Sequence, residues 1–145
     1  MTDALSLNQQ VCFPLYAALR AITAVYRPKL EALGLTYPQY LVMLVLWEQD
    51  ERNVGELSAA LALDSGTLSP LLKRLEAAGL VERHRSAADE RRVEIRLTER
   101  GRALREQACA IPAEMLEATG MQLEELVALR ETLQRMTASL TSHIR

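Results

Sequence analysis

Cysteine and histidine are scarce in this sequence, and their positions exclude several kinds of site. The two cysteines, Cys12 and Cys109, are too few and too far apart for a disulfide framework or a metal-binding knuckle. Neither His84 nor His143 is placed as an obvious base for a cysteine nucleophile. The sequence also lacks a glycine-rich phosphate loop. We therefore expect a protein that is not an enzyme and that holds neither a cofactor nor a metal.

Long apolar runs are also missing. No stretch reaches the roughly 18 consecutive apolar residues of a membrane span, and the N-terminal residues lack the basic-then-apolar layout of a signal peptide. The 145 residues are 49% hydrophobic and 25% charged, which is enough for one domain with a substantial core. We expect a single domain over residues 1–145, a cytoplasmic location, and two thiols that are reduced at rest.

The net charge is only −2, but it is unevenly distributed along the chain. Residues 73–105 contain ten basic and six acidic side chains and carry +4, whereas the segments before and after each carry −3. Positive charge confined to one segment is the electrostatic footprint of a surface that faces DNA. This distribution disfavours a helical dimer with no role in DNA binding.

Two short helical patterns follow each other in the middle of the chain. The segment Asn53-Val-Gly-Glu56 resembles a capping box and starts a helix of about two turns that stops at Leu63. Asp64 can cap a second helix over residues 65–78. The apolar stripe of that second helix consists of leucines, namely Leu68, Leu71, Leu72 and Leu75. This pattern predicts a helix-turn-helix whose second helix buries the leucine face.

The opposite face of the second helix is small, hydroxylic and basic. Small residues let the backbone approach a DNA groove, and hydroxyl and basic groups bond phosphates and base edges. The candidate DNA-binding residues on this face are Ser65, Thr67, Ser69, Lys73 and Arg74. An ordinary amphipathic helix with a solvated polar face would show the same pattern, so this helix alone does not identify a DNA-binding protein.

A hairpin pattern follows the second helix. Residues 80–85 and 92–97 both alternate apolar with polar side chains, as half-buried strands do. Their polar connection can enter a minor groove, where the negative potential favours arginine. The candidate DNA-binding residues on the hairpin are Arg85, Asp89, Arg91 and Arg92. Residues 53–101 therefore predict a winged helix-turn-helix.

The hairpin and the start of the next helix carry a recognisable signature. It reads Asp89-x-Arg91, then Val93-x-Ile95-x-Leu97-Thr98-x-x-Gly101. This signature resembles that of the MarR (multiple antibiotic resistance regulator) family of winged-helix repressors. The resemblance implies that Arg91 reaches the minor groove and that Asp89 helps to position basic residues.

A long helical pattern over residues 8–33 precedes the winged segment. Its start is ambiguous: the helix begins either around Phe13, with Pro14 in the favoured first turn, or near Ser6, with Pro14 distorting it. In the first case Cys12 lies at a helix N-terminus. Pro28 stands inside the pattern and is a candidate kink after Tyr26.

A second, very apolar helix is predicted next. Thr36-Tyr-Pro-Gln39 is a capping box that opens a helix from Tyr37 to about Glu48. We expect this helix to be buried nearly all round. Four of its side chains are expected to pack between the winged segment and the terminal helices, namely Met43, Leu44, Leu46 and Trp47.

After the hairpin, one helix is expected from Thr98 to Gly120 and another over residues 122–143. The last helix has apolar residues at heptad-like spacing, namely Leu126, Leu129, Leu133, Met136 and Leu140. Helices over residues 8–33 and 102–143 exceed what one winged domain needs to cover its sheet. They predict a two-fold homodimer that binds a pseudo-palindromic double-stranded DNA operator. The predicted fold class is mainly α with a small β-hairpin wing.

Further motifs narrow the resemblance to one branch of the family. They are Cys12-Phe-x-Leu-Tyr16, Tyr26-x-Pro28, Leu35-Thr-Tyr-Pro-Gln-Tyr40 and Asp64-Ser-Gly-Thr67. They closely resemble the branch that senses organic hydroperoxides, and the resemblance covers nearly the entire chain. It implies that Cys12 is the redox sensor, that Tyr26 and Tyr37 contact it from the partner subunit, and that Tyr16 lines the same pocket. Two-cysteine members carry a resolving thiol near Glu117, so Cys109 is out of position and the one-cysteine type is favoured.

The chemistry of these residues supports the same hypothesis less strongly. A phenol can donate a hydrogen bond to a thiolate, and a helix N-terminus stabilises it further. On composition alone, Cys12 is more readily interpreted as a small buried hydrophobe. The predicted function is a repressor that releases its operator when an organic hydroperoxide oxidises Cys12, with a small thiol as the partner of a mixed disulfide. The alternative is a MarR-type repressor released by a small phenolic or apolar ligand.

Overall fold

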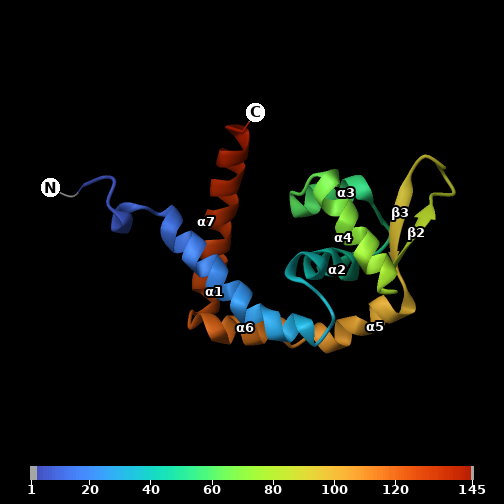
Figure 1. The fold of residues 1–145 in the computed structure, drawn as a ribbon, viewed down its shortest axis with the longest axis horizontal. Coiled ribbons are helices and arrows are strands. Elements are labelled where there is room, and N and C mark those ends of the chain that lie inside the picture. The colour runs from blue at the N-terminus through green and yellow to red at the C-terminus, as the bar shows by residue number, and fades with distance from the viewer. Residues whose placement is uncertain (1–2, 145) are drawn as a thin grey trace. The chain divides into compact units, whose positions relative to one another are not determined.

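The structure is a computed structural model that describes residues 3–144 (Figure 1). It is mainly helical with one small antiparallel sheet, which confirms the predicted fold class. The chain divides into two compact units, of which the first extends to Cys109 and the second begins at Ala110. The single domain over residues 1–145 stays a prediction. Within residues 3–144, none of the helices is both long and apolar enough to traverse a bilayer.

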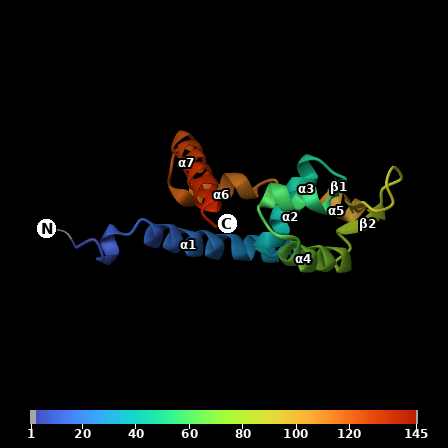
Figure 2. The same ribbon diagram turned by 90° about the horizontal axis from the view of Figure 1, so that it is seen from above.

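The first unit begins with a short 3₁₀ turn, η1 (Leu7–Gln9), and the long helix α1 (Cys12–Glu31). The first of the two predicted starts is therefore correct. Pro14 is the third helical residue, where its missing N–H has no carbonyl to bond because the first four N–H groups of a helix have no intrahelical acceptor. Pro28 lies inside α1, and the helix continues past it to Glu31. The N-terminal part of α1, which does not contact α2, extends away from the winged part of the same unit (Figure 2).

Helix α2 (Tyr37–Glu48) starts with the predicted capping box at Thr36 and Gln39. The prediction that α2 is buried nearly all round is wrong, because Leu44 is 39% exposed and Trp47 is only half-buried. Its neighbours in the first unit are α1, α3, α4 and α5, and they cover only part of its circumference. The residues that it buries are Gln39, Tyr40, Val42, Met43 and Leu46.

The winged part comprises six elements. In chain order they are β1 (Arg52–Asn53), α3 (Val54–Leu61), α4 (Ser65–Ala77), β2 (Val81–Arg85), β3 (Val93–Leu97) and α5 (Glu99–Ala108). The predicted hairpin is confirmed, and it gains a third strand, since the sheet order is β1-β3-β2 with antiparallel pairing. Strand β1 has only two residues and is too short to show an alternating pattern, so the sequence did not predict it. Helix α3 ends at Leu61, two residues before the predicted stop, because Ala62 adopts a left-handed conformation with φ of 53°.

The core of the first unit lies under α4. The predicted leucine stripe of this helix is buried throughout, and α2, α3 and the sheet supply its partners. Asp64 caps α4 as predicted, because its Oδ1 accepts a hydrogen bond from the Thr67 N–H at 2.7 Å. Helix α4 ends at Ala77, one residue earlier than predicted, and Gly79, with φ of 76°, turns the chain into β2.

The second unit contains α6 (Ile111–Thr119) and α7 (Leu123–Ser142). The prediction of one helix from Thr98 to Gly120 is wrong, because α5 ends at Ala108 and α6 starts at Ile111. Pro112 explains the break, since it has no N–H and its ring would clash with the Ala108 carbonyl in a continuous helix. Among the described residues of α7 none is buried, and Leu123 and Leu140 are 58% and 57% exposed.

Candidate nucleic-acid interface and thiol site

The face of α4 opposite the leucine stripe is open to solvent. Ser65, Thr67, Lys73 and Arg74 are exposed, and Ser69 is half-buried. The five candidate residues of α4 therefore lie outside the core, with hydroxyl groups toward its N-terminus and the two cations toward its C-terminus. Such a surface can approach DNA closely and contact phosphates and base edges.

Hydrogen bonds hold α4 at both ends. At its start, the Thr67 N–H bond to the Asp64 carboxylate keeps the pKa of Asp64 below its usual value. At its end, the Thr98 hydroxyl donates to the Gly79 carbonyl at 2.6 Å, and the Arg100 guanidinium donates to the Ala78 carbonyl at 3.1 Å. The C-terminus of α4 is thus bound to the junction between β3 and α5.

The wing is the β2–β3 hairpin with its tip at residues 86–92. The Ser86 N–H donates to the Arg92 carbonyl at 2.9 Å, and the Arg92 N–H donates to the Asp89 carbonyl at 2.9 Å. Asp89 Oδ1 accepts the Arg91 N–H at 3.0 Å and contacts Arg91 Nε at 3.4 Å. The Arg91 side chain is nevertheless 93% exposed. Asp89 therefore shapes the tip while the Arg91 guanidinium reaches solvent.

Arg85 and Arg92 belong to the same hairpin. The Arg85 guanidinium donates to the Glu90 carbonyl at 2.9 Å, so it braces the tip from the β2 side, and the Arg92 side chain is exposed. The hairpin lies beside the C-terminal part of α4, and its tip extends away from the helices (Figure 1). The structure thus brings the candidate residues of α4 and of the wing into one unit.

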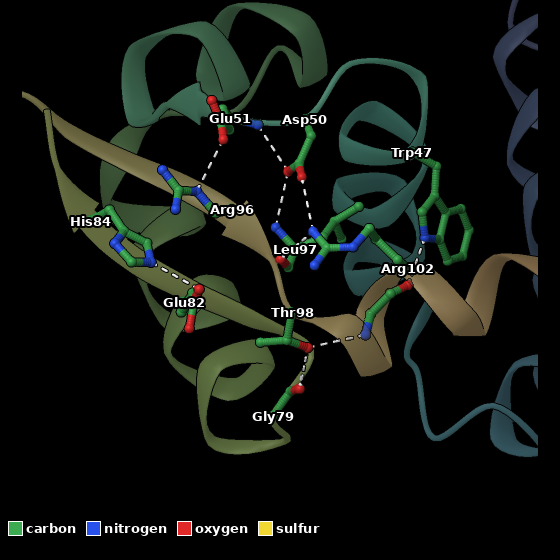
Figure 3. A network of polar contacts seen from close by, with 11 residues as sticks. Trp47, Asp50, Glu51, Gly79, Glu82, His84, Arg96, Leu97, Thr98 and Arg102 are labelled. Atoms are coloured by element: carbon green, nitrogen blue, oxygen red, sulfur yellow. Dashed lines mark hydrogen bonds and ion pairs between the residues drawn. The ribbon is translucent and has the colours of Figure 1, made fainter.

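The base of the wing has a polar network that sequence reasoning missed (Figure 3). Asp50 Oδ1 accepts the Leu97 N–H at 2.9 Å, and Asp50 Oδ2 lies 3.6 Å from Arg102 Nη1. Arg96 Nε lies 3.1 Å from a carboxylate oxygen of Glu51. These pairs join the loop after α2 to the last strand of the wing and to the first turn of α5. The partners are 45 or more positions apart in the sequence, and neither periodicity nor a short motif could reveal them.

Cys12 is the first residue of α1, and its thiol is exposed in this single chain. One turn further along, Tyr16 is 61% exposed, and the Arg20 guanidinium lies 5.7 Å from the centre of its ring. Phe13, next to the thiol, is exposed as well. The other thiol, Cys109, is exposed at the end of α5 and lies near the Glu106 carbonyl, with Sγ 2.9 Å from that oxygen.

The two candidate phenols, Tyr26 and Tyr37, pack against each other. Their ring centroids are 4.9 Å apart, and the Tyr40 ring lies 5.9 Å from the first and 6.4 Å from the second. Burial, with Tyr37 and Tyr40 nearby, raises the pKa of Tyr26 to about 12. Tyr40 was not among the predicted site residues, although its position three residues after Tyr37 on a helix was a usable signal.

Within one chain, the thiol and these phenols are far apart. Cys12 and Tyr26 are 14 residues apart on the same helix, which is about 21 Å along its axis at 1.5 Å per residue. A cavity of about 270 Å³ lies beside the phenols between α1 and α2. Its lining includes Thr23, Tyr26, Arg27, Thr36 and Tyr37.

A recognition helix, a hairpin wing and long flanking helices define a winged helix-turn-helix regulator. Residues 24–107 match the family model described as transcriptional regulator SarA/Rot. The chain therefore belongs to the MarR-type winged-helix transcriptional regulators, and it is a DNA-binding transcriptional regulator of that type. The predicted resemblance is confirmed.

Individual relatives agree with this assignment over nearly the whole chain. The chain is 49% identical over 138 residues to the HTH-type transcriptional regulator TtmR of Methylorubrum extorquens (strain PA1), covering 95% of this chain and 71% of the relative. It is 45% identical over 138 residues to the organic hydroperoxide resistance transcriptional regulator of Bacillus subtilis (strain 168). This match covers 95% of this chain and 94% of the relative. The structure of reduced AbfR from Staphylococcus epidermidis bound to DNA aligns with a TM-score of 0.77 at 34% identity. The alignment covers 93% of this chain and 94% of the AbfR chain.

Proposed function

We propose that the protein is a homodimeric repressor that releases its operator when an organic hydroperoxide oxidises Cys12. The observation that carries this proposal is the placement of the thiol. Cys12 is exposed at the N-terminus of α1, about 21 Å along the helix axis from Tyr26 of its own chain. Phenols from a second copy can therefore complete its surroundings. The name of the 45%-identical Bacillus subtilis relative supports organic hydroperoxides as the oxidant class.

Exposed apolar side chains support the homodimer. Helix α1 and the turn before it expose Leu7, Val11, Phe13, Leu19 and Ile22, and α7 exposes Leu123, Leu129 and Leu140. A two-fold dimer would bury such residues and present two α4 helices to a pseudo-palindromic operator. In this dimer the Tyr26 and Tyr37 of each subunit would contact the thiol of the other, with Tyr16 lining the same pocket.

The DNA contacts are assigned by position. The α4 residues Ser65, Thr67, Ser69, Lys73 and Arg74 contact phosphates and base edges in the major groove. On the wing, Arg91 and Arg92 enter the minor groove, Asp89 holds Arg91 at the tip, and Arg85 braces the tip from β2.

The sensing reaction is a two-electron oxidation of Cys12. Its thiolate attacks the outer oxygen of the hydroperoxide, an S–O bond forms, and the O–O bond breaks. The thiolate becomes a sulfenic acid, and the hydroperoxide is reduced to an alcohol, whose oxygen takes a proton from water. A small thiol can then displace the sulfenic oxygen as water and leave a mixed disulfide.

Oxidation releases DNA because it changes the dimer. A sulfenic acid or mixed disulfide is bulkier than a thiolate, so the phenols that contact it must move. Because those contacts cross the two-fold axis, one subunit tilts against the other and the spacing of the two α4 helices changes. A two-half-site operator does not tolerate that change.

The test compares the wild-type protein with Cys12→Ser and Cys109→Ser. Each reduced protein is titrated onto an operator that the wild-type protein has selected from random-sequence DNA, before and after treatment with cumene hydroperoxide. We expect the wild-type and Cys109→Ser proteins to release the DNA and Cys12→Ser to keep it. If Cys12→Ser is also released by the peroxide, the assignment of the sensor is wrong. Release of all three proteins by a phenolic ligand, with no peroxide response, would support ligand control instead.

A further inference from the structure

Helix α2 joins the phenols to the base of the wing. At its N-terminal end, Tyr37 and Tyr40 pack against Tyr26 of α1. At its C-terminal end, the Trp47 ring meets Tyr40 edge-on, with ring centroids 6.4 Å apart. Three aromatic rings of α2 and the Tyr26 ring of α1 therefore stand in successive contact, with one end of the row at the predicted thiol partners.

The other end of this row is anchored to the winged part by a hydrogen bond. Trp47 Nε1 donates to the Gly101 carbonyl at 2.9 Å, across 54 positions of sequence (Figure 3). Gly101 is the third residue of α5, and its own N–H donates to the Thr98 hydroxyl at 3.0 Å. That hydroxyl in turn holds the Gly79 carbonyl at the end of α4.

Gly101 has little freedom to move alone. A side chain at this position would collide with the Leu80 carbonyl, so the backbone of α5 lies directly on the start of β2. The Thr98 N–H also donates to the Leu80 carbonyl, at 3.0 Å. A displacement of Gly101 therefore moves the α4 C-terminus and the base of the wing together.

A second anchor from the segment after α2 lies close to the first. Asp50, three residues after Trp47, accepts the Leu97 N–H at the end of β3 and faces the Arg102 guanidinium. Arg102 also donates to the Leu97 carbonyl at 3.0 Å. The end of α2 thus holds the last residue of the wing and the first turn of α5 at two points.

We propose that Trp47 is a positioning residue that transmits movement of the Tyr26–Tyr37–Tyr40 cluster to the wing and to the recognition helix. The proposal rests on the proposed function, in which oxidation of Cys12 displaces those phenols. A hydrogen bond of 2.9 Å weakens once its atoms separate or misalign by more than a few tenths of an ångström. A shift of the aromatic row is therefore either passed to Gly101 or breaks the bond, and both outcomes change how α4 and the wing are held.

The test is Trp47→Phe, which keeps an aromatic ring beside Tyr40 and removes the N–H donor. Three quantities are measured on the full-length protein: the rate of Cys12 oxidation by cumene hydroperoxide, the Kd of the reduced protein for its operator, and the Kd of the oxidised protein. We expect an unchanged oxidation rate. The ratio of the oxidised to the reduced Kd should fall by about fivefold, the factor that one neutral hydrogen bond supplies.

Controls separate this effect from a general loss of stability. Glu48→Gln changes the neighbouring exposed residue of α2 and should leave all three quantities unchanged. Asp50→Asn is the second variant, for use if Trp47→Phe folds too poorly to measure. It keeps an oxygen for the Leu97 N–H but loses the charge that faces Arg102, and it should lower the Kd ratio. An unchanged Kd ratio in a folded Trp47→Phe protein would overturn the proposal. If oxidation does not release even the wild-type protein, the proposed function fails as well.

Discussion

The rings of Tyr26 and Tyr37 lie 4.9 Å apart between centroids, although they belong to different helices. Their packing leaves both phenols half-buried, and this partial burial raises both pKa values, that of Tyr26 to about 12. Both hydroxyls therefore keep their protons at neutral pH. A protonated phenol is a hydrogen-bond donor, which is the property that a thiolate partner needs.

Replacing these phenols tests their role at Cys12. We expect Tyr26→Phe and Tyr37→Phe to slow oxidation of Cys12, because each change removes a hydrogen-bond donor to the thiolate. DNA binding by the reduced protein should be unaffected. Tyr40→Phe is the matched control, since Tyr40 is only 3% exposed and is not one of the expected partners of the thiolate. If all three variants react like the wild-type protein, the phenols serve only as packing groups.

The raised pKa of Tyr26 predicts how stability depends on pH. The folded protein keeps this proton until about pH 12, whereas the unfolded chain loses it near the ordinary tyrosine pKa of 10.0. The unfolded state therefore binds fewer protons between these values, and the free energy of unfolding falls as the pH rises through that range. Denaturant unfolding at a series of pH values should show a shallower fall in Tyr26→Phe. An identical fall in both proteins would contradict the shift.

Arg91→Ala tests the wing. We expect weaker operator binding with unchanged thermal stability, because the side chain is exposed and lies at the tip. Loss of one phosphate or minor-groove contact should lower the slope of log affinity against log salt by roughly 1. Arg130→Ala removes an exposed arginine from α7 and serves as the charge-matched control. Unchanged affinity and slope in Arg91→Ala would remove the wing from the DNA interface.

Two neighbouring residues test the orientation of α4. Lys73→Ala should weaken operator binding while the circular dichroism of the protein stays the same, because Lys73 faces solvent. Leu72→Ala should lower the free energy of unfolding by about 2–5 kcal/mol, as expected for truncation of a buried leucine. The opposite pattern would mean that the exposed face of α4 is not the face that binds DNA.

Gly101→Ala tests the close contact between α5 and the start of β2. An added Cβ would collide with the Leu80 carbonyl, and relieving such overpacking costs about 1–3 kcal/mol. Gly66→Ala is the control for stability, because a Cβ there meets only the Asp64 carboxylate at an ordinary 3.4 Å. A Gly101→Ala protein as stable as the wild type would show that the junction can relax.

Local patterns in the sequence were sufficient for most of the helices and strands. The Thr36, Asn53 and Asp64 caps, the leucine stripe of α4 and the two strands of the wing all depend on residues within a few positions of one another. Side-chain periodicity and capping chemistry report such features directly. The break before Pro112 was also local, and the apolar periodicity across it concealed the proline signal.

Only the tertiary structure decided what joins these elements. The bond from Trp47 to Gly101, the bond from Leu97 to Asp50 and the pairing of β1 with β3 connect residues more than 40 positions apart. The contact of Tyr40 with Tyr26 also depends on how α1 and α2 cross. Each of these contacts requires two distant segments to be placed side by side, and no local spacing in the chain encodes that placement. The sequence by itself determined the local elements and predicted which surfaces bind DNA and which thiol reacts, whereas the packing of α2 decided how the phenols are physically connected to the winged part.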